Sequence, residues 1–115
     1  MNKAKVERPR RFQIRRNGEL IYEEHRFICL IHDISEKGIF LICNYYLEIG
    51  QEFAVRFEFE PGLNFEAKIR ISHFSDGCFG AEIIEVDPRS NSNWNQFLKN
   101  NYADQLRLPE RRVRR

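Results

Sequence analysis

The sequence is poor in the features that mark several classes of protein. Its three cysteines, Cys29, Cys43 and Cys78, are odd in number and form no Cys-x-x-Cys pair. This argues against a disulfide framework or a structural zinc site and favours a reducing compartment. Uncharged apolar runs such as Phe27–Ile31 are far too short to cross a membrane, and no apolar stretch follows the basic start of the chain. We therefore expect a cytoplasmic protein without membrane insertion.

Charge is distributed unevenly along the chain, although the formal net charge is only +2. Residues 1–16 carry seven Lys or Arg against one Glu, and residues 107–115 carry five Arg against one Glu, which leaves −8 for residues 17–106. We therefore predict a flexible basic arm over 1–16, a folded body over 17–106 and a basic tail over 107–115. An acidic body disfavours binding to long nucleic acid, whereas the basic ends favour recognition of anions.

Short β-type runs separated by turn residues fill most of the body. The six runs are Glu19–Tyr22, Arg26–Ile34, Ile39–Cys43, Glu52–Glu60, Phe65–Phe74 and Cys78–Val86. Clean apolar–polar alternation, as in the fourth and fifth runs, is typical of half-buried antiparallel strands. The Pro-Gly pair at 61–62 and the Asp-Gly pair at 76–77 predict tight turns.

A helix is predicted after the last run. Asp87 suits the N-cap and Pro88 the first helical position. An apolar stripe follows at three- and four-residue steps, made of Trp94, Phe97, Leu98, Tyr102 and Leu106. The stripe suits a core contact or a dimer contact equally well. Because closure removes exposed sheet edges, six antiparallel strands and one covering helix predict a mainly β fold, a closed or nearly closed barrel.

Residue patterns that support catalysis or metal binding are missing. No histidine is paired by sequence with a nucleophile, and Ser35 lacks the Gly-x-Ser-x-Gly elbow. Cys29 and His32 are three residues apart, which places them on opposite faces of a strand and disfavours joint metal ligation. No glycine-rich phosphate loop is present. We expect neither an enzyme nor a metal site.

Arginines crowd the predicted arm just before the first run: Arg8, Arg10, Arg11, Arg15 and Arg16. A guanidinium can donate two parallel hydrogen bonds to phosphate oxygens or to guanine O6 and N7, and it can stack on a base. A solvated basic tail would have the same composition. The arginines alone therefore leave both interpretations open.

A second polar element lies between the second and third runs, in Asp33-Ile-Ser35-Glu-Lys-Gly38. Asp33 and Ser35 share parity, which lets both side chains project to one side of the strand end. A carboxylate can accept from guanine N1 and N2, and a hydroxyl can bind phosphate or an amino group. Gly38 permits a positive φ at a tight turn, or close approach of a ligand. A turn that satisfies its own backbone remains the alternative.

Together, the two elements resemble the signature of the PilZ family. That signature is Arg-x-x-x-Arg before the first strand, followed by Asp/Asn-x-Ser-x-x-Gly between later strands, matched here by Arg11 to Arg15 and by Asp33 to Gly38. Leu47-x-x-Gly50 and Phe79-Gly-Ala81 are also similar to the family, so the resemblance spans roughly residues 8–106. It implies a PilZ-like, split-barrel type of six-stranded barrel with one C-terminal helix.

The resemblance also implies a ligand, cyclic di-GMP, and no cofactor. Arg11 and Arg15 would hold phosphate and guanine, Asp33 and Ser35 would hold guanine and backbone, and Gly38 would shape the turn. Arg10 matches a position at which family members with Arg bind two stacked nucleotides rather than one.

The output implied by the resemblance is a changed surface offered to a downstream protein partner. A nucleotide-independent adaptor that acts through protein contacts is the main alternative, and an RNA-binding barrel is a weaker one, because the polar strand faces carry mostly Glu. Residues Arg111 to Arg115 repeat the arginine spacing at the wrong end of the family's order, and we assign them no role.

Overall fold

A computed structural model of the chain describes residues 10–106, with side chains described through Tyr102. Residues 1–9 of the predicted arm and the whole predicted tail lie outside the described residues. The elements are β1 Phe12–Tyr22, β2 His25–Ile34, β3 Gly38–Ile42, β4 Glu52–Glu60, β5 Leu63–Ser75, β6 Cys78–Val86 and α1 Pro88–Leu106.

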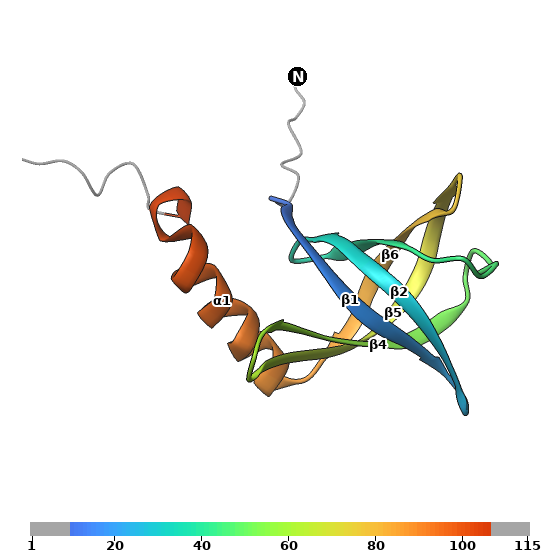
Figure 1. Ribbon diagram of the computed structural model, residues 1–115, viewed down its shortest axis with the longest axis horizontal. Coiled ribbons are helices and arrows are strands. Elements are labelled where there is room, and N and C mark those ends of the chain that lie inside the picture. Colours follow the sequence, from blue (N-terminus) through green and yellow to red (C-terminus); the bar gives the residue numbers. More distant parts are fainter. Residues whose placement is uncertain (1–9, 107–115) are drawn as a thin grey trace, which may run out of the picture.

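The six strands form one closed antiparallel barrel in the order β1-β2-β3-β6-β5-β4, with α1 beside one end (Figure 1). Pairing between β1 and β4 closes it, for example between Leu20 and Val55. The predicted fold class, a six-stranded antiparallel barrel with a single C-terminal helix, is confirmed. Closure leaves the barrel with no unpaired strand edge.

The start of β1 differs from the sequence prediction. The strand begins at Phe12 rather than near Glu19, so residues 12–16 belong to the barrel wall and not to a flexible arm. Phe12 and Ile14 point into the apolar interior, which explains why this basic segment is held. The arm boundary at residue 16 was therefore wrong for these five residues.

Local signals set the turns and the helix start. Asp76 and Gly77 both have positive φ, at 48° and 78°, as a two-residue hairpin turn requires. Asp87 caps the helix, because its Oδ1 accepts a hydrogen bond from the Ser90 backbone N–H at 2.7 Å. The helix is distorted at Tyr102, where φ is −134° and ψ is 24°.

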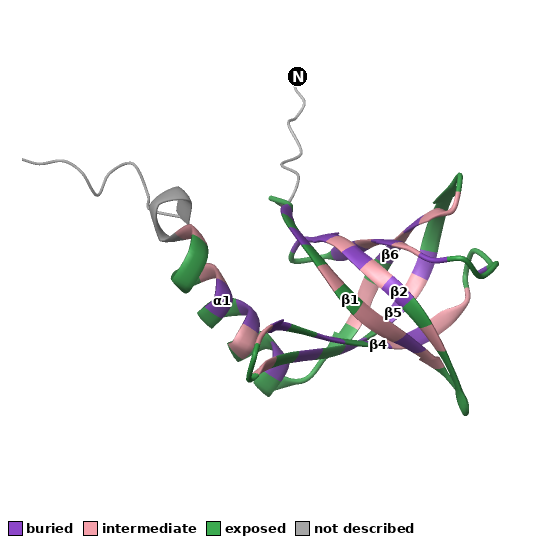
Figure 2. Ribbon diagram, viewed as in Figure 1, coloured by how far each residue is buried: buried purple, intermediate pink, exposed green. Residues whose placement is uncertain are grey.

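The barrel interior is apolar from end to end (Figure 2). At one end, Trp94 and Phe97 of α1 cover it, and the ring of Phe59 lies stacked against Phe97 at 4.8 Å between centroids. The apolar stripe of the helix therefore packs on the core. At the other end, Leu47 of the β3–β4 connection is buried and closes the barrel.

Two of the three cysteines are buried among the core residues. Burial raises the pKa of the Cys29 thiol to about 12, with a smaller contribution from neighbouring Cys43. Burial also raises the pKa of Cys43. Because the thiolate is the reactive species, these two groups are protected in the folded protein.

Alkylation should therefore be selective. At pH 8, iodoacetamide is expected to modify half-buried Cys78 first and to leave Cys29 unmodified until denaturant is added. Mass spectrometry of a time course with and without urea measures this. Equal labelling of Cys29 and Cys78 in the native protein would show that the barrel opens locally around β2.

Candidate functional site

The start of β1 lies directly against the end of β2. Gln13 pairs with Asp33 and Phe12 pairs with Ile34 across the two strands. This register brings Arg11 beside Asp33, with 2.5 Å between Arg11 Nη1 and Asp33 Oδ1. One residue from each of the two sequence motifs is thus in direct contact, although they are 22 positions apart.

The Asp33 carboxylate is largely buried and both of its oxygens are engaged. Arg11 donates to Oδ1, and His32 Nδ1 lies 2.9 Å from Oδ2. The His32 ring in turn meets the Phe40 ring edge to face, with centroids 5.9 Å apart. A ligand that accepts from Arg11 therefore meets a guanidinium that Asp33 already orients, which lowers the entropic cost of binding.

Ser35 is buried in the turn between β2 and β3 and bonds mainly within it. Its Oγ accepts from the backbone N–H groups of Lys37 and Gly38, at 3.2 and 3.1 Å. Its own N–H donates to the Gly38 carbonyl at 2.8 Å. This arrangement matches the self-satisfied turn that sequence reasoning left open, so the hydroxyl first of all fixes the shape of the loop.

Gly38 is required for packing rather than for turn conformation. The sequence left two roles open for Gly38, and the first of them, a positive φ at the turn, does not hold. A Cβ built at this position would lie 2.8 Å from the Ala81 carbonyl oxygen of β6 and 3.8 Å from Arg11 Nη2. Glycine thus lets β3 approach β6 closely and leaves room for the Arg11 guanidinium.

Replacing Gly38 with alanine should destabilise the fold by about 1–3 kcal/mol, because the added methyl group meets backbone and cannot be accommodated without a shift. Urea unfolding measures the loss. The same substitution in an Arg11→Ala background is the control and should cost as much, since the obstacle is the Ala81 carbonyl. Recovery of stability in that background would identify Arg11 as the obstacle instead.

Arg15 occupies a β-bulge in β1. Gln13 pairs with Asp33 and Arg16 with Ile31, so Ile14 and Arg15 together oppose His32. Arg15 has a φ of 52°, a left-handed conformation that costs a non-glycine residue about 1 kcal/mol. Its side chain is exposed, and within residues 10–106 it makes no hydrogen bond or ion pair. Strain of this kind often accompanies function.

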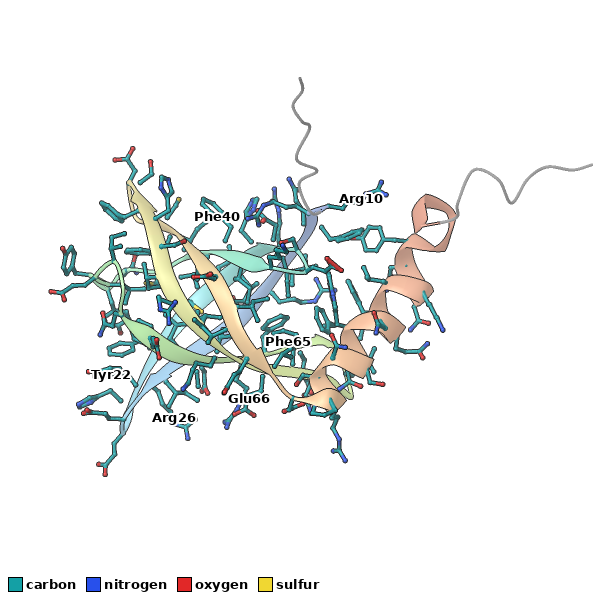
Figure 3. The ribbon with its side chains drawn as sticks, turned by 180° about the vertical axis from the view of Figure 1, so that it is seen from behind. Arg10, Tyr22, Arg26, Phe40, Phe65 and Glu66 are labelled. Atoms are coloured by element: carbon teal, nitrogen blue, oxygen red, sulfur yellow. The ribbon has the colours of Figure 1, made fainter. Side chains whose placement is uncertain are left out.

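Arg10 and Arg16 lie toward the helix instead of toward Asp33. The Arg10 guanidinium lies over the Phe12 ring, 5.6 Å from its centroid, and Figure 3 shows Arg10 and Phe40 on opposite sides of the start of β1. Arg16 Nε donates to the Phe59 carbonyl at 2.7 Å, and its guanidinium faces Phe97. The structure therefore brings Arg11, Asp33 and Gly38 together and sets Arg10 apart from them.

His32 and Phe40 border this cluster, and sequence reasoning did not assign them to it. Both are half-buried, and Phe40 pairs with Asp33 in the β2–β3 ladder. The sequence held only a weak indication of their role. The run Ile39–Cys43 is apolar on both parities, which places Phe40 on the outer face of its strand but does not indicate what it contacts there. The arrangement as a whole offers guanidinium groups, an imidazole and an aromatic edge, which suits a planar, anionic ligand.

The chain is thus a small closed six-stranded barrel in which Arg11, just before the first strand, contacts Asp33 of the Asp-x-Ser segment. The family model of the PilZ domain matches residues 5–100, and the chain belongs to the PilZ domain family. This is a family of binding and adaptor domains whose ligand is cyclic di-GMP.

Among solved structures, the chain is similar in fold to the Bacillus subtilis inhibitor of motility, MotI/DgrA, with a TM-score of 0.65 and 16% identity. The match covers 91% of this chain and 53% of that one, so the chain spans about half the length of MotI/DgrA. The comparison with curated proteins found none that matches.

Within residues 10–106, no helix is both long and apolar enough to span a membrane. In the same part of the chain, no group of three or more His, Cys, Asp or Glu side chains is arranged to hold a metal ion.

Proposed function

We propose that this chain is a cytoplasmic receptor for cyclic di-GMP that catalyses no reaction. The observation that carries the proposal is the contact of Arg11 with Asp33, beside the Ser35–Gly38 turn. It joins both family motifs at one surface. Arg15 on the neighbouring bulge is exposed and has no partner among residues 10–106, so it adds a second phosphate-binding group at the same strand start.

The geometry indicates a different role in ligand binding for each site residue. Arg15 binds phosphate, because its guanidinium has no competing partner among the described residues. Arg11, held by Asp33, presents its remaining N–H groups to a phosphate or to guanine O6 and N7. For Asp33 to accept from guanine N1 and N2, its contact with His32 must loosen. Ser35 and Gly38 contribute the rigid loop that holds Asp33 in place.

Ligand binding would reorganise the basic residues that precede β1. A nucleotide with two phosphates neutralises part of their mutual repulsion, at an ordering cost on the order of 1–2 kcal/mol for each residue fixed. Charge-assisted hydrogen bonds at roughly 1.5–3 kcal/mol each can offset that cost. The resulting surface of protein and nucleotide would be read by a downstream protein.

Isothermal titration calorimetry of the full chain with cyclic di-GMP tests the proposal. Saturable binding that GMP fails to reproduce supports it, and the stoichiometry shows whether one nucleotide binds or two, as the arginine at position 10 implies. Absence of binding in a folded sample would favour the nucleotide-independent adaptor.

A further inference from the structure

Large apolar side chains are exposed at the end of the barrel remote from α1. They form what we call the distal aromatic surface: Tyr22 at 37% exposure, Tyr45 at 47%, Tyr46 at 79% and Ile49 at 59%. They come from the last residue of β1 and from the β3–β4 connection, and Figure 1 shows the β1–β2 turn and this connection away from the helix. Monomeric surfaces rarely gather such groups without an interaction to make.

Ring contacts make this surface continuous. Tyr22 lies 5.7 Å from Phe53, Phe53 lies 6.2 Å from Phe27, and Phe27 lies 4.9 Å from Tyr45, between centroids. Tyr22 and Tyr45 therefore rest on partly or fully buried phenylalanines, which hold their rings in position. Rigid tyrosines are among the side chains that contribute most to protein interfaces, because little conformational entropy is lost when they bind.

The connections at the same end of the barrel are acidic, and the cation beside them, Arg26, is already paired with Glu19. The three connections there, residues 23–24, 43–51 and 76–77, contain no Lys or Arg. They contain the carboxylates Glu23, Glu24, Glu48 and Asp76, none of which makes an ion pair within the described part of the chain. On the barrel wall, by contrast, several carboxylates are paired, as in Glu52 with Arg70 and Glu66 with Arg56. These four carboxylates of the connections are thus available to a partner.

The exposed tyrosines and unpaired carboxylates together indicate which class of molecule this surface can bind. Anionic membranes and nucleic acids are repelled by unpaired carboxylates. An arginine-containing protein segment fits both features, because guanidinium groups stack on tyrosine faces and pair with carboxylates. We infer that the distal aromatic surface docks an arginine-containing segment of a partner protein. The nucleotide candidate site lies at the other end of β1, because Arg11 directly precedes Phe12, the first residue of the strand, and Tyr22 is its last residue. The inference therefore does not rest on nucleotide binding.

The probe for this docking is a fluorescein-labelled octapeptide of alternating arginine and leucine, titrated with the full chain at low salt and followed by anisotropy. A matched peptide with glutamate in place of arginine should not bind. The double variant Tyr45→Ser/Tyr46→Ser should weaken binding about 10-fold. Glu23→Gln/Glu24→Gln should weaken it about 3-fold and reduce its salt dependence. The second variant keeps the test decisive if the first does not fold.

The matched control removes two carboxylates from the barrel wall, with Glu58→Gln/Glu85→Gln, and should change affinity less than 2-fold. Arg15→Ala should leave peptide binding unchanged, so failure of the docking inference can be distinguished from failure of the nucleotide proposal.

If the wall variant lost as much peptide affinity as the Glu23→Gln/Glu24→Gln variant, the inference would be overturned. So would vesicle binding or self-association of the chain that disappears with Tyr45→Ser/Tyr46→Ser, since the occupant would then be a membrane or a second copy.

Discussion

The Arg15→Ala protein is expected to bind cyclic di-GMP about 10- to 100-fold more weakly than the unmodified chain, which corresponds to loss of a charge-assisted hydrogen bond. Its stability should change little, because the Arg15 side chain is exposed and makes no hydrogen bond or ion pair within residues 10–106. Arg15→Gly should bind equally weakly yet be more stable than Arg15→Ala by about 1 kcal/mol, since glycine adopts the left-handed conformation without strain. Calorimetric titration and urea unfolding measure the two effects separately.

The neighbouring positions provide the comparison. Arg11→Ala should weaken binding by a similar factor and also destabilise the fold, because the largely buried Asp33 loses a partner. Arg89→Ala removes an equal charge from the start of α1 and should leave binding within about 2-fold, since exposed charges far from a ligand are screened by salt. Unchanged affinity in both the Arg11 and the Arg15 variants would remove the basis of the proposed site.

Phe59→Ala should produce the largest loss of stability in the chain, about 3–5 kcal/mol. Phe59 is fully buried at the end of β4. Its ring contacts Phe97 at 4.8 Å, Phe57 at 5.0 Å and Trp94 at 5.4 Å. Truncation opens a cavity between the barrel and the helix. Thermal unfolding should show a midpoint lower by roughly 15–30 °C for a domain of this size.

Phe74→Ala is the matched control, with the same atoms removed from an exposed position on β5. It should cost less than about 1 kcal/mol, as surface substitutions usually do. Fluorescence of Trp94, the single tryptophan, follows the contact between helix and barrel directly. Similar midpoints for the two variants would show that α1 contributes little to the stability of the barrel.

Much of the barrel could be predicted from the sequence, because its signals are local. Alternation over Glu52–Glu60 follows from one buried face, and the Asp76-Gly77 turn follows from the positive φ of both residues. The cap at Asp87 likewise depends on a contact only three residues away. Each of these features is decided by side chains within a few positions.

The features that were missed depend on distant neighbours. The bulge at Arg15 and the polar composition of residues 15–17 interrupt the period of two, which concealed the first half of β1. The role of Arg16 depends on the Phe59 carbonyl, 43 positions away. The reason for Gly38 is a carbonyl on β6, which no local pattern indicates. For the candidate site, the motif residues were predictable, but their bordering side chains His32 and Phe40 were not.

Adjacent residues at the start of β1 link two surfaces of the molecule. Arg11 contacts Asp33, while Phe12 meets Trp94 edge to face at 5.7 Å and Tyr102 at 4.7 Å, between ring centroids. Because Phe12 directly follows Arg11, we expect a displacement of the Arg11 backbone to alter the ring contacts that hold α1. The position of the helix would then depend on the state of the arginine cluster.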